Sequence, residues 1–156
     1  MPTQPNSIQP TSMISPINLF DFRWSQAKSV LPNIPETSVS ASFGESEHFK
    51  KQRGYAVTRI EGNVIKVVFS VKIHCLVVHK IDAIVRHEIG HVIDFTIPHF
   101  DLDEIAQNNS VYLPNTPERR ADAIAQLLWG EPIRYDSDDV QSLTTGVFPR
   151  PERLGL

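Results

Sequence analysis

The chain has 156 residues, of which 40% are hydrophobic and 21% charged, enough for one domain whose core needs no disulfides. Its net charge of −3 argues against a nucleic-acid-binding protein. No segment approaches the roughly 20 apolar residues of a membrane span. A single cysteine, Cys75, favours a reducing compartment. We therefore expect a soluble cytoplasmic protein, virion-associated if a phage encodes it, with neither nucleic-acid nor membrane partners.

The N-terminal part of the chain gives the weakest structural pattern. Residues 1–17 are rich in Pro, Ser, Gln, Thr and Asn, and this composition predicts an extended or disordered arm that could bind an assembly partner. We expect the folded domain to cover residues 18–145 and a tail to cover 146–156. Prolines after position 31 limit an early helix to about residues 25–31.

Three segments in the middle of the chain predict strands. Residues 55–60 and 63–70 are rich in β-branched side chains and flank a hairpin turn at Glu61 and Gly62. The apolar segment 71–78 supplies a third predicted strand. Because these strands precede the helices instead of alternating with them, we predict an α+β fold in which a small antiparallel three-stranded sheet packs on the helices.

Two helices follow the predicted strands. Apolar residues recur at helical spacing over residues 80–95, and the pattern ends before Pro98. A second helix is predicted to run from a start at Thr116 and Pro117 through Trp129. The first of these helices carries the motif on which the functional prediction depends.

The first helix contains an H-E-x-x-H motif. Its histidines, His87 and His91, lie about 40° apart on one face, so both imidazoles can bind a single zinc ion. Glu88 lies between that face and the apolar stripe, where its carboxylate can act as general base toward a zinc-bound water. A surface helix with solvated side chains is the alternative. Gly90 argues against it, since a mid-helix glycine is costly unless another backbone comes close.

A catalytic zinc site needs a third protein ligand. Glu118, in the first turn of the second helix, is one candidate, and the alternative is that it only interacts with the helix dipole. Asp94 competes, because it lies on the same face of the first helix as His87. We prefer Glu118, whose longer side chain approaches from a separate helix. Asp122 follows it by one turn and could orient a zinc-bound histidine from outside the ligand shell.

The sequence HEIGH, followed about thirty residues later by ERRADAIAQLL, resembles the ImmA/IrrE-type zinc peptidases and, more widely, the gluzincins. This resemblance covers roughly residues 64–129. It implies a zinc metallopeptidase with His87, His91 and Glu118 as ligands, Glu88 as catalytic base and Asp122 as a supporting residue. Many members carry asparagine where this chain has Asp122. The metzincin pattern fits less well, because no histidine stands six residues after His91.

Peptide hydrolysis also requires a donor that stabilises the oxyanion. Tyr112 and His99 are candidates, as are Arg119 and Arg120, and the sequence does not choose among them. We expect the segment 71–78 to be an edge strand that receives an extended peptide by strand addition.

Two functions from different classes fit these observations. The first is a zinc-dependent metallopeptidase that acts on a protein or peptide substrate. The second is a structural or assembly protein, for example of a phage or mobile element, that keeps a zinc site and binds partners through its extended termini.

Overall fold

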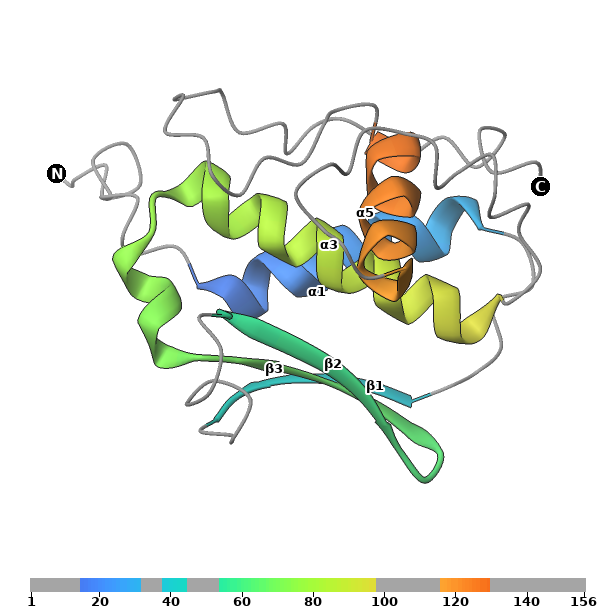
Figure 1. Ribbon diagram of the computed structural model, residues 1–156, viewed down its shortest axis with the longest axis horizontal. Coiled ribbons are helices and arrows are strands. Elements are labelled where there is room, and N and C mark those ends of the chain that lie inside the picture. Colours follow the sequence, from blue (N-terminus) through green and yellow to red (C-terminus); the bar gives the residue numbers. More distant parts are fainter. Residues whose placement is uncertain (1–14, 32–37, 45–53, 98–115, 130–156) are drawn as a thin grey trace, which may run out of the picture.

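The computed structural model describes residues 15–31, 38–44, 54–97 and 116–129. In these residues a three-stranded sheet forms one layer and the helices lie on one side of it (Figure 1). The α+β class is as predicted. Within the described residues, no helix is both long and apolar enough to cross a membrane. The elements in chain order are α1 (Pro16–Val30), β1 (Ser38–Phe43), β2 (Ala56–Glu61), β3 (Val64–Phe69), η3 (Val71–Cys75), α3 (Val78–Thr96) and α5 (Thr116–Trp129).

The sheet is mixed, so the predicted antiparallel sheet is wrong in part. Its strand order is β1-β3-β2. The hairpin of β2 and β3 is antiparallel, as predicted, and turns at Gly62, whose φ of 62° suits a residue without a Cβ. β1 pairs with the other edge of β3 in parallel register, with Ser38 opposite Val64. The prediction missed β1, whose sequence SVSASF contains few large apolar residues.

The segment 71–78, predicted as the third strand, is not a strand. Val71–Cys75 forms the 3-10 helix η3, and α3 begins at Val78. Ser70 starts this turn, because its hydroxyl accepts a hydrogen bond from the Lys72 amide at 3.2 Å. Ile73, fully buried, anchors the turn in the core. The run of apolar residues was therefore compatible with both structures, and the cap at Ser70 decides between them.

The three described α-helices differ in how closely they follow their predicted ranges. α3 and α5 match their predicted ranges to within two residues. α1 begins at Pro16, with Ser15 as its N-cap, so the helix extends well before the predicted 25–31. The predicted boundary between arm and domain at residue 17 therefore falls inside α1. Residues 1–14 and the tail 146–156 lie outside the described residues.

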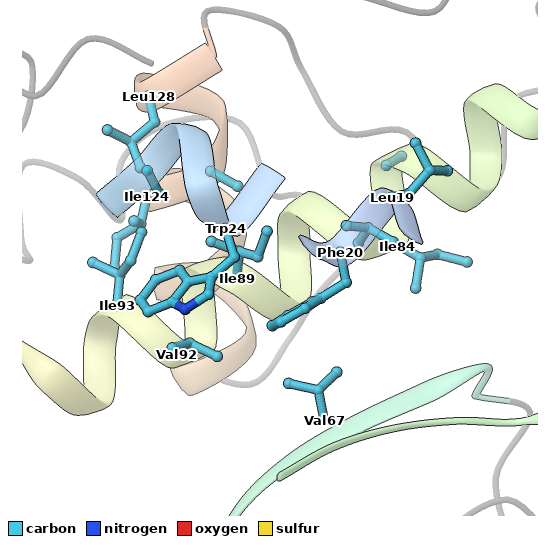
Figure 2. Packing of buried hydrophobic residues seen from close by; sticks show 14 of the residues in the cluster. Leu19, Phe20, Trp24, Val67, Ile84, Ile89, Val92, Ile93, Ile124 and Leu128 are labelled. Carbon is cyan, nitrogen blue, oxygen red and sulfur yellow. The ribbon is translucent and has the colours of Figure 1, made fainter. Parts of the chain in front are cut away.

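The hydrophobic core lies between the helices and the sheet. Figure 2 shows Trp24 of α1 beside Ile89 and Val92 of α3, with Ile124 and Leu128 of α5 at the same end of the cluster. Fully burying an aliphatic side chain of this kind stabilises the fold by about 1.5–3 kcal/mol. The core thus fixes α3, which carries the H-E-x-x-H motif, against both neighbouring helices.

A buried polar network also joins the three helices. Arg23 of α1, fully buried, donates to both carboxylate oxygens of Asp82 of α3, at 2.8 and 2.9 Å. Arg86 donates to the same carboxylate at 3.1 Å. Gln26 accepts hydrogen bonds from Arg23 and from the Trp129 indole of α5, each at 3.0 Å. Because these groups are buried, an arrangement of the helices that separated the charged partners would be costly. The network therefore favours the observed arrangement.

Candidate metal centre

Helix α3 presents the two motif histidines to α5. Both imidazoles are largely buried, and their rings stand perpendicular with centroids 4.8 Å apart. Oε2 of Glu118 lies 2.7 Å from Nε2 of His87 and 3.1 Å from Nε2 of His91. A single carboxylate oxygen is therefore held between the two imidazoles.

The close packing of α5 on α3 brings Glu118 to this position. A Cβ built on Gly90 would lie 2.0 Å from the carbonyl oxygen of Ala121, so only glycine fits there. Ala121 and Ala125 are fully buried. The sequence-based inference that another backbone approaches Gly90 is confirmed.

His87, His91 and Glu118 form a group that could hold a metal ion, since their ligand atoms all lie within 4.8 Å of one another. In tetrahedral zinc sites, with zinc–ligand distances of about 2.0–2.1 Å, donor atoms lie roughly 3.3 Å apart. Small side-chain movements would therefore convert the observed arrangement into a ligand set. Two imidazole nitrogens and one carboxylate oxygen are also a donor set that zinc uses in catalytic sites. The residues present thus fit zinc.

Without an ion, contacts within and beside this group shift the pKa values of His87 and Glu118. Burial lowers the pKa of His87, but its contacts with Asp122 and Glu118 outweigh burial and raise the pKa to about 10. Hydrogen bonds with His87 and His91 hold the pKa of Glu118 well below its usual range. The ion-free centre is therefore a carboxylate paired with a protonated imidazole, and a metal ion would replace the proton.

Glu88 lies beside this group and touches the sheet. Its carboxylate is buried, with Oε2 4.0 Å from Nε2 of His87. The hydroxyl of Thr58, on β2, donates to Oε1 of Glu88 at 2.7 Å. Thr58 was not predicted as a site residue, because a lone threonine in a strand carries no motif and its contact lies 30 residues away.

Two further predicted residues, Asp122 and Asp94, do not enter the group. Oδ1 of Asp122 is 3.6 Å from Nδ1 of His87, on the side of the ring away from Glu118. Asp94, the rival third ligand, instead accepts a hydrogen bond from Arg120 of α5 at 2.6 Å. In this structure Asp94 therefore ties α5 to α3 and does not join the histidines.

The candidate oxyanion donors are only partly placed. Tyr112 and His99 lie outside the described residues. Arg120 is engaged by Asp94, and Arg119 also lies in α5, one residue after Glu118.

Comparison with known proteins yields no relative. No family model matches the chain, and no curated protein and no solved structure matches it at a significant level. The resemblance to the ImmA/IrrE-type peptidases therefore stays a prediction, and the function is argued from the site.

Proposed function

We propose that the protein is a zinc-dependent peptidase in which His87, His91 and Glu118 bind the metal and Glu88 is the general base. One observation carries the proposal. The carboxylate of Glu118, from a separate helix, meets both motif histidines, while the Glu88 carboxylate stays outside that group but close to it. An arrangement of three ligands and one unbound carboxylate is what metal-assisted hydrolysis requires.

The chemistry that zinc supplies when bound is to lower the pKa of a coordinated water to about 7 and to polarise the substrate carbonyl. A zinc ion bound by two neutral imidazoles, of His87 and His91, and by the single negative charge of Glu118 would keep a net positive charge. Asp122 reduces that charge and faces Nδ1 of His87, so Nε2 is directed toward the ligand group.

Glu88 moves the proton in this proposal. Its Oε2 accepts a proton from the attacking water as the water oxygen bonds to the carbonyl carbon. The same carboxyl group then gives that proton to the departing amine nitrogen as the carbon–nitrogen bond breaks. Because Glu88 is buried, the proton is not readily lost to bulk water between the two steps.

The β2 edge of the sheet supports a peptide as substrate. Among the described strands, β2 pairs only with β3, so no described strand covers its other edge. β2 also carries Thr58, which touches Glu88, so this edge runs beside the site. An extended peptide adding to β2 would pass close to the base. The expected role of segment 71–78 in strand addition is wrong, because its residues 71–75 form η3.

The proposal is tested by metal analysis together with a peptide-library cleavage assay. We expect about one zinc per chain in the wild type and in Glu88→Gln, and cleavage by the wild type alone, since an amide cannot accept the proton. Loss of zinc in Glu88→Gln would make Glu88 a ligand and contradict the mechanism. Bound zinc without cleavage in the wild type would favour the assembly role.

A further inference from the structure

We propose that Thr58 is a positioning residue that fixes the carboxylate of Glu88, with Oε1 held by the sheet and Oε2 turned toward the metal-binding group. The inference rests on the proposed function and assigns part of the mechanism to a residue outside the motif. The contact that carries it is the hydrogen bond from the Thr58 hydroxyl to Oε1 of Glu88, at 2.7 Å.

The sheet determines where the Thr58 hydroxyl lies. Thr58 is paired with Val67 of the central strand, and paired residues share one face of a sheet. Val67 is fully buried against the helices, so Thr58 also faces α3. A β-branched side chain is stiff at χ1, which limits the directions available to the hydroxyl. The donor is therefore fixed by a backbone ladder and by its own side chain.

Glu88 needs such a partner because its own side chain is flexible. A glutamate has three rotatable bonds, and its helix determines only the position of its Cβ. The hydrogen bond from Thr58 has a normal O–H···O length of 2.7 Å, and with a carboxylate as acceptor it belongs to the stronger, charge-assisted class. It occupies Oε1 and leaves Oε2 on the side of His87, 4.0 Å from Nε2. Thr58 thus selects which carboxylate oxygen faces the reacting water.

The kinetic test compares Thr58→Val, which keeps the shape but lacks the hydroxyl, with Thr58→Ser, which keeps the hydroxyl. We expect Thr58→Val to lower kcat by about tenfold or more, because small displacements of a catalytic group have effects of this size. KM should change by less than roughly threefold, since the lost contact serves the reaction and not substrate binding. Thr58→Ser should recover most of kcat. Ser42→Ala, which removes an exposed hydroxyl from β1 at the other edge of the sheet, is the matched control and should leave kcat unchanged.

A second measurement needs no activity. In metal-free protein, Thr58→Val is introduced into the wild type and into Glu88→Ala, and the urea midpoints are compared in a double-mutant cycle. We expect Thr58→Val to lower the midpoint in the wild type more than in Glu88→Ala, because only the wild type loses the hydrogen bond. Zinc affinity should be equal in wild type and Thr58→Val.

The two measurements separate this inference from the proposed function. Coupling in the cycle in a protein that cleaves no peptide would support the placement of Glu88 by Thr58 and contradict the peptidase. An active wild type with unchanged kcat in Thr58→Val would overturn the role of Thr58 alone. Independent effects of the two substitutions in the cycle would likewise overturn it.

Discussion

Replacing Gly90 by alanine should destabilise the protein, although the same change usually stabilises a helix by about 1 kcal/mol. The new Cβ would lie 2.0 Å from the carbonyl oxygen of Ala121 and 2.7 Å from its carbonyl carbon. Carbon–oxygen contacts of this kind are normally about 3.3 Å or longer, so α3 and α5 must separate by roughly 1.3 Å. A backbone atom cannot avoid the contact by changing rotamer.

The size of the effect follows from this displacement. Overpacking a core costs about 1–3 kcal/mol, and the upper end applies here because an entire helix must move. In a chain of this length, 1 kcal/mol corresponds to about 2–4 °C in Tm, so a cost of about 3 kcal/mol should lower Tm by roughly 6–12 °C. α5 also carries Glu118, three residues before Ala121. Its displacement should lower zinc affinity by about tenfold or more.

Thermal unfolding of the metal-free protein and zinc titration with a competing chelator measure the two effects. Ser25→Ala, at an exposed position of α1, is the control for helix propensity and should leave both quantities nearly unchanged. Adding Ala121→Gly to Gly90→Ala should not restore stability, because the contact is with the carbonyl group and not the side chain of Ala121. An unchanged or higher Tm in Gly90→Ala, with unchanged zinc affinity, would refute the reasoning.

Three further outcomes can be measured. Glu118→Ala should weaken zinc binding by at least roughly tenfold and Asp94→Ala by less, and affinities in the reverse order would transfer the ligand role to Asp94. Because the pKa of His87 is raised from 6.5 to about 10, the stability that its charge contributes is complete below pH 6.5 and is lost as the pH rises through 10. The urea midpoint of metal-free protein should fall between pH 6.5 and 10, and it should fall less steeply in Asp122→Asn. Equal pH dependence in the two proteins would contradict the contact between Asp122 and His87. Asp82→Asn should cost about 3–5 kcal/mol in unfolding free energy by leaving buried guanidinium charge uncompensated, and a loss under about 1 kcal/mol would contradict this.

The two helices that carry the site were predictable because their patterns are local. The apolar repeat of α3 and the start of α5 at Thr116 depend on residues within a few positions of one another. The sheet was not predictable to the same degree. A serine-rich edge strand such as β1 has little hydrophobic pattern, and the apolar run at η3 satisfies strand and helix templates alike.

In the site too, the local features were predictable and the contacts between separate elements were not. Spacing along one helix places His87 and His91 on a common face. This could be predicted from the sequence alone, without the fold. The sequence already favoured Glu118 over Asp94 as the third ligand, but the contact that engages Asp94, with Arg120 at a separation of 26 residues, could not be predicted. Thr58 likewise reaches Glu88 only because β2 folds under α3. Contacts between separate elements have no local pattern, so they required the structure.

The buried network of Arg23 has a consequence for the order of events during synthesis. Arg23 and its partner Asp82 are 59 residues apart, and Gln26 and its partner Trp129 are 103 apart. Contacts at such separations form slowly, because long loops must close first. As the chain leaves the ribosome, α1 emerges before α5, so the hydrogen bond between Gln26 and Trp129 cannot form until residue 129 has been made. We therefore expect the nascent chain to acquire its metal-binding group only after translation of nearly the whole described sequence.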